Sequence, residues 1–101
     1  MEPNIEIISA DEKMLGYIIK KSLLPPKTKF ITIPEHPFQL GYIVYPTGGV
    51  IPRHYHKPVK REIHNSSEAL IVLKGECAID FYDQQLKLVA SRELIEGDIV
   101  L

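Results

Sequence analysis

Residues 48–75 read GGVIPRHYHKPVKREIHNSSEALIVLKG, and this stretch decides how the chain is expected to fold. Its first part, 50–56, and its aliphatic part, 69–74, have the composition of short β-strands. Working outward, 76–82 (ECAIDFY) follows Gly75 directly and has the alternating pattern of a further strand. Similar short runs lie between turn residues at 30–33, 38–45, 86–90 and 99–101. This close spacing of strands predicts an all-β sandwich or barrel.

The amino-terminal part predicts a helix instead. Ser9 and Glu12 have the spacing of a capping box. Apolar residues then form a stripe at helical spacing: Met14, Leu15, Ile18, Ile19 and Leu23. Because Pro25 and Pro26 would stop it, we expect a helix over about 10–23. The expected organisation is an N-terminal helical segment, 1–29, outside a single β-barrel domain, 30–101.

The composition is that of an ordinary folded protein. The chain has 101 residues, 45% of them hydrophobic, and a formal net charge of −1. This even balance gives no electrostatic reason to expect binding to nucleic acid or to an anionic membrane. Cys77 is the only cysteine, which excludes an internal disulfide, and its place on the apolar face of 76–82 predicts that it is buried. Since the chain has no apolar run of about 20 residues and no signal-peptide pattern, the expected location is the cytoplasm.

Three of the four histidines lie close together in the sequence, at positions 54, 56 and 64. His54 and His56 are two residues apart on a predicted strand, so their side chains leave the same face. Two imidazoles on one face can share a divalent ion such as Zn, Fe, Mn or Ni. Glu68, which opens the next predicted strand, is a candidate for a further ligand. The alternative interpretation is a pair of surface histidines without a ligand.

The order of these residues resembles the first motif of the cupin superfamily, G-x5-HxH-x3,4-E-x6-G. Gly48 stands six residues before His54, and Gly75 stands seven after Glu68, as in that motif. Pro52 lies two residues before His54, where cupins often carry a proline. The resemblance implies a cupin double-stranded β-helix, or jelly roll, with a divalent metal held by His54, His56 and Glu68.

The spacing departs from the motif between the second histidine and the glutamate, where eleven residues stand instead of three or four. They predict a long loop at the mouth of the barrel. A second alignment, with Glu62 and His64 in place of the two histidines, restores the usual spacing. We prefer His54, His56 and Glu68 because only this choice explains Gly48 and Pro52. His64 is then a loop residue near the metal, which leaves it three roles: a further ligand, an acid–base group or a bystander. If the chain is an enzyme, His64 and Glu62 are the candidate acid–base residues.

The second cupin motif is matched only at its opening. Residues 97–101 (GDIVL) resemble its first residues, and the sequence ends there. We therefore expect a C-terminally shortened cupin, without the last histidine ligand and the closing strands. An open β-edge exposes unpaired backbone groups, so a homodimer is the expected state.

The resemblance leaves several functions open. It allows a metal-dependent isomerase, epimerase or dioxygenase acting on a small polar, sugar-like substrate. Pro46, Thr47, Gly48 and Gly49 predict a turn at 46–49. The candidate substrate-binding residues are Arg53, which alternates with the histidines, and Tyr45, which precedes this turn. The alternatives are a non-catalytic cupin that binds a small-molecule ligand or metal, and a fragment without activity of its own. Whether the chain is an enzyme is left undecided by its residues.

Overall fold

A computed structural model describes residues 3–36, 39–60 and 66–101, and these residues form β-strands and loops. They contain no helix, and therefore none long and apolar enough to cross a membrane. The chain divides into two compact units, which are described separately below. Unit 1 comprises residues 1–24 and 67–101, and unit 2 comprises residues 25–66. The prediction of an all-β protein is confirmed.

The predicted N-terminal helix over 10–23 is wrong, because these residues belong to a β-hairpin. β1 (Ile5–Ala10) and β2 (Lys13–Ile19) pair antiparallel around a two-residue turn. In that turn Asp11 and Glu12 have φ angles of 52° and 64°, the left-handed values of the type I′ turns that suit hairpin twist. The supposed capping box is thus a turn. The isoleucine-rich runs on both sides extend because β-branched side chains pack well on a pleated sheet.

Unit 1 is organised around a four-stranded antiparallel sheet in the order β1-β2-β8-β5. β8 (Ile99–Val100) lies between β2 and β5 (Leu70–Ile71) and pairs with both. The pairing with β2 continues one residue further, since Tyr17 and Leu101 exchange backbone hydrogen bonds of 2.8 and 3.0 Å. The end of the chain is therefore held in the middle of this sheet.

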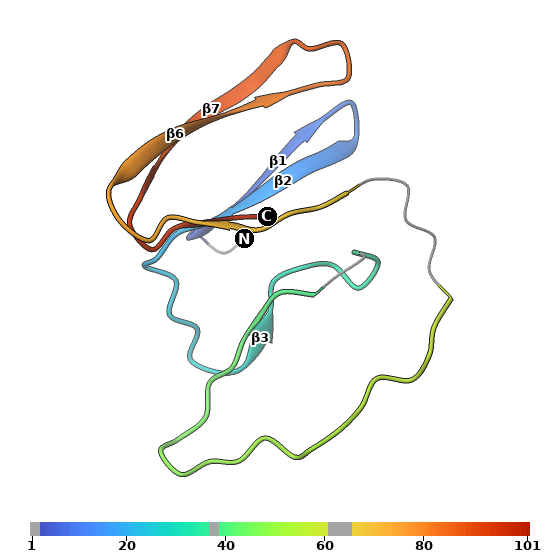
Figure 1. Cartoon of the computed structure of the whole chain (residues 1–101), viewed down its shortest axis with the longest axis vertical. Helices are drawn as coiled ribbons and strands as arrows, with labels where there is room; N and C mark the ends of the chain where they lie inside the picture. The colour runs from blue at the N-terminus through green and yellow to red at the C-terminus, as the bar shows by residue number, and fades with distance from the viewer. Residues whose placement is uncertain (1–2, 37–38, 61–65) are drawn as a thin grey trace. The chain divides into compact units, whose positions relative to one another are not determined.

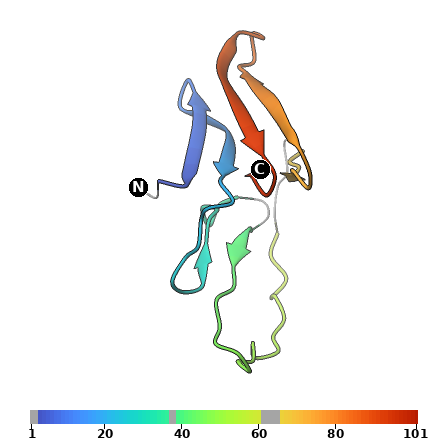
Figure 2. The ribbon, with the colours of Figure 1, turned by 90° about the vertical axis from the view of Figure 1, so that its left-hand side faces the viewer.

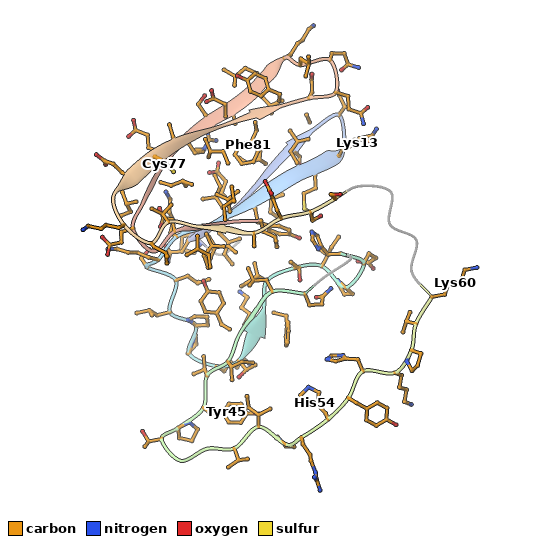
Figure 3. All side chains as sticks on the ribbon, viewed as in Figure 1. Lys13, Tyr45, His54, Lys60, Cys77 and Phe81 are labelled. Carbon is orange, nitrogen blue, oxygen red and sulfur yellow. The ribbon has the colours of Figure 1, made fainter. Side chains whose placement is uncertain are left out.

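A second hairpin packs against this sheet within unit 1. β6 (Glu76–Tyr82) has the predicted bounds, and β7 (Leu88–Ile95) pairs with it antiparallel. Figures 1 and 2 show the β6–β7 hairpin alongside the β1–β2 hairpin. Phe81 points from β6 toward β1 and β2 (Figure 3) and is 8% exposed. The core that it helps to form comprises Ile8, Ile18, Phe81, Leu94 and Val100.

Cys77 lies on β6 but is exposed, so the prediction that its thiol is buried is wrong. Figure 3 shows Cys77 near the start of β6, at the end of the hairpin opposite its turn and away from Phe81. Alternation along the strand assigned it to the inward face, but the core does not extend over the whole length of that face.

Asp98 is a fully buried charged residue that joins the β7–β8 turn to the end of β2. Its Oδ1 accepts a hydrogen bond of 2.9 Å from the Lys21 amide, and its Oδ2 accepts one of 2.9 Å from the Ile95 amide. Lys20 Nζ lies 3.5 Å from Oδ2. Burial would raise the pKa of Asp98, but the two amide hydrogen bonds and the Lys20 charge together outweigh burial and lower the pKa below its ordinary value.

An ion pair also connects the two hairpins of unit 1. Arg92 on β7 donates from Nε and from its terminal nitrogen to the two carboxylate oxygens of Glu6 on β1, at 2.9 and 2.7 Å. The hydrogen bonds from Arg92 lower the pKa of Glu6. Both side chains are partly exposed, so the pair aligns the hairpins and contributes little free energy.

The described part of unit 2 contains one short hairpin, in which β3 (Lys29–Phe30) pairs with β4 (Gly41–Tyr42). The Phe30 ring covers Gly41 so closely that a Cβ there would lie 2.6 Å from the ring. An aromatic side chain over a cross-strand glycine is a known way of protecting the bare backbone. The strand predicted for 50–56 is not formed. In the described parts of the chain the three sheets have four, two and two strands, and they do not close into a barrel.

Candidate metal-binding segment

A β-turn leads into the segment that carries the two histidines. The Gly49 amide donates to the Pro46 carbonyl oxygen at 2.8 Å, and Gly48 has a φ of 82°. This is the pattern of a type II turn, whose third residue is normally glycine. The turn predicted at 46–49 is thus confirmed, and Gly48 of the motif is explained by backbone conformation. Tyr45 stands just before it, half exposed, against Gly49.

His54 and His56 lie beyond this turn on an extended, exposed stretch (Figure 3 labels His54). Their ring centroids are 5.5 Å apart, and the ring planes are inclined at 74°. The two rings therefore lie together although the segment is not part of a sheet. Side chains two residues apart leave the same side of any extended backbone, so the prediction about the pair holds even though the predicted strand does not.

A backbone contact determines which nitrogen of His54 is available. Its Nδ1 lies 2.9 Å from the carbonyl oxygen of Pro52. A carbonyl oxygen can only accept, so Nδ1 carries the proton in this hydrogen bond and the Nε2 lone pair stays free. Metal-binding histidines are commonly oriented in this way by an acceptor that is hydrogen-bonded to the ring nitrogen not facing the metal. The sequence identified Pro52 only as a motif position and did not predict this role. Every residue has a backbone carbonyl, and the residue types alone do not show which carbonyl accepts a hydrogen bond.

The remaining predicted site residues are placed as follows. Arg53 is exposed beside His54, and Glu68 is exposed two residues before β5. His54 and His56 belong to unit 2, whereas Glu68 belongs to unit 1. The candidate acid–base residues, Glu62 and His64, lie outside the described residues.

The described ranges contain no group of three or more His, Cys, Asp or Glu side chains that could hold a metal ion together. The arrangement that they do contain is a pair of imidazoles with one nitrogen already engaged. Such a pair supplies two ligands and leaves the other coordination positions of an ion to further groups.

Comparisons of the chain with known proteins found no match. No protein-family model, no curated protein and no solved structure matches the chain. The functional interpretation therefore depends on the residues of this chain alone.

Proposed function

We propose that this chain is a small metal-binding protein of the cupin type, in which His54 and His56 hold a divalent ion. The observation that carries the proposal is the position of the two imidazoles, with centroids 5.5 Å apart and Nδ1 of His54 bonded to Pro52. Gly48 and Pro52 at their motif positions support it, and so does the all-β architecture. A cupin jelly roll is the arrangement that we propose for the β-strands of this protein.

The residues present suit a borderline divalent ion such as Zn, Fe, Mn or Ni, because neutral imidazole nitrogen is a favoured ligand of each. Glu68 is the further ligand that the motif nominates. When bound, the ion would act as a Lewis acid toward an oxygen of a small ligand. The contribution of this chain is to present two nitrogens on one side of a short segment and to hold one of them in the required tautomer.

The proposal is tested by titrating the metal-free protein with Zn²⁺ and with Mn²⁺ in a calorimeter. We expect one ion per chain, and we expect His54→Ala and His56→Ala each to weaken binding at least about tenfold. His36→Gln is the matched control, because it removes a histidine of unit 2 outside the pair. If His54→Ala binds the ion as tightly as the wild type, the proposed pair is wrong.

Two further measurements examine the details. Long-range ¹⁵N NMR on the metal-free protein should find the proton of neutral His54 on Nδ1. On addition of Zn²⁺, Nε2 should show the larger change in chemical shift. Glu68→Gln should also weaken binding if the carboxylate is a ligand, and unchanged affinity in this variant would remove Glu68 from the proposal while leaving the histidine pair.

A further inference from the structure

The outer side of β1 is the long open edge of the four-stranded sheet in unit 1. β1 lies at one end of the order β1-β2-β8-β5, and Figure 2 shows it as the outermost strand on that side. The strand at the other end, β5, has only two residues, whereas β1 has six. β8 lies between two strands, so the open edge of this sheet is near the start of the chain and not at its end.

The hydrogen bonds of β2 show which backbone groups of β1 point outward. Tyr17 on β2 exchanges both of its backbone hydrogen bonds with Leu101, at 2.8 and 3.0 Å. Its register partner on β1, Ile7, therefore receives neither of them. Because the bonding side alternates from residue to residue in an antiparallel strand, the N–H and C=O groups of every second residue face away from β2. These residues are Ile5, Ile7 and Ser9, and no described residue provides a hydrogen-bond partner for their outward groups.

β1 has none of the features that usually protect an open edge, which are proline, a bulge and unpaired charge. The bulge of this hairpin lies on β2, where Leu15 is the extra residue, so β1 itself is regular. The one charged side chain of β1 is Glu6, and Arg92 binds both of its carboxylate oxygens. Each strand of the β6–β7 hairpin, in contrast, carries two charged residues. A further strand therefore meets least opposition at β1.

The space beside this edge is open. A hollow of about 470 Å³ is lined by residues 3–7 together with Ile18 and Lys20 at the end of β2. Ile7 is 42% exposed although it lies in the middle of a strand. An added strand would give the outward backbone groups their partners and would remove apolar surface of Ile7 from water.

We propose that β1 of a second copy of this chain occupies this edge, antiparallel to the first and related to it by a twofold axis at Ile7. Ile7 then opposes Ile7 of the second copy, a β-branched pair of the kind that stabilises sheets. Ile5 opposes Ser9, so the outward groups of the two copies meet. Glu6 opposes Ile8, so the two carboxylates are not opposite each other. An edge without net charge favours a strand without net charge, and β1 is itself such a strand. The inference does not rest on the metal site, whose histidines belong to unit 2.

The test is sedimentation velocity of the full wild-type chain over a range of concentrations. EDTA is present throughout, because it removes any ion that could bridge the histidines of two copies. We expect a reversible dimer with a dissociation constant of about 10–100 µM, since one pair of strands buries less area than a stable interface needs. A chain that stays monomeric at the highest concentration would overturn the proposal.

Two matched variants test whether β1 is the contact. Ile7→Lys and Ile95→Lys place the same charge at similarly exposed isoleucines, 42% and 46%, on β1 and β7. A lysine on an edge strand opposes edge-to-edge pairing. We expect Ile7→Lys to weaken self-association at least about tenfold and Ile95→Lys less than about twofold. Equal losses in the two variants would show that the contact is not at β1.

Amide hydrogen exchange of the wild type, followed by NMR, provides a readout that does not depend on the folding of a variant. The amides of Ile5, Ile7 and Ser9 should exchange rapidly in dilute solution and become protected as the concentration rises. Those of Glu6 and Ile8, which face β2, should be protected at both concentrations. If the outward amides were protected equally in dilute solution, another segment of the same chain would cover the edge, and the proposed second copy would be wrong.

Discussion

Replacement of Asp98 by alanine is expected to destabilise unit 1 more than any other removal of a single carboxylate from its described residues. The side chain is 0% exposed, and its two oxygens accept the amides of Lys21 and Ile95, both at 2.9 Å. Alanine would remove the acceptor from both of these partly buried hydrogen bonds. An unsatisfied buried group costs about 1–3 kcal/mol, so the two together cost up to about 6 kcal/mol. The pair with Lys20 at 3.5 Å adds about 1 kcal/mol at most.

The assay is urea denaturation followed by circular dichroism, with the free energy of unfolding compared at pH 7. Asp80→Ala is the matched control, because Asp80 is exposed on β6 and, among the described residues, accepts hydrogen bonds from the Tyr82 and Ser91 side chains only. We expect a loss of about 4 kcal/mol for Asp98→Ala and less than about 1 kcal/mol for Asp80→Ala.

The pH dependence provides a second, independent readout. The pKa of Asp98 is lowered in the folded protein, so the stability that its charge contributes is present above the unfolded-state pKa. That stability is lost as the pH falls through the folded-state pKa. The difference between wild type and Asp98→Ala should therefore narrow in acid. If Asp98→Ala were as stable as Asp80→Ala at pH 7, Asp98 would not have the buried linking role described for it.

Three further outcomes follow from the packing of unit 1. Phe81→Ala should lower the free energy of unfolding by about 3–5 kcal/mol in the same assay, since the ring is in the core. The control Tyr82→Ala removes a half-exposed neighbouring side chain and should lower it by about 1 kcal/mol or less. Similar losses in the two variants would contradict the assigned core. Gly97→Ala should destabilise more than Gly75→Ala, because both glycines have positive φ but only at Gly97 would a Cβ meet a side chain, at 2.8 Å. Cys77 should react with a thiol reagent in the native protein as fast as in the unfolded chain, because it is exposed; slow labelling that urea accelerates would show that the thiol is covered.

The features that the sequence determined by itself are those that depend on neighbouring residues. The strand 76–82 has the predicted bounds because alternation with period two and the preceding Gly75 are both local signals. The turn at 46–49 formed because a type II turn needs a glycine at its third position. The pairing of His54 with His56 is also local, since two residues of extended backbone suffice to bring the rings together.

The tertiary structure alone decided the features that depend on residues far apart in the chain. The stripe at Met14, Ile18 and Ile19 satisfies a helix and a strand about equally, and pairing with β1 on one side and β8 on the other resolved it in favour of a strand. Residues 50–56 have the composition of a strand but pair with no strand among the described residues, so this segment stayed extended without pairing. No local pattern marks Asp98 as a buried link, because the Lys21 amide that it accepts lies 77 residues away in the sequence. Hydrogen bonds and apolar contacts between distant residues form only once the chain has folded, and they outweigh local preferences that differ by about 1 kcal/mol or less.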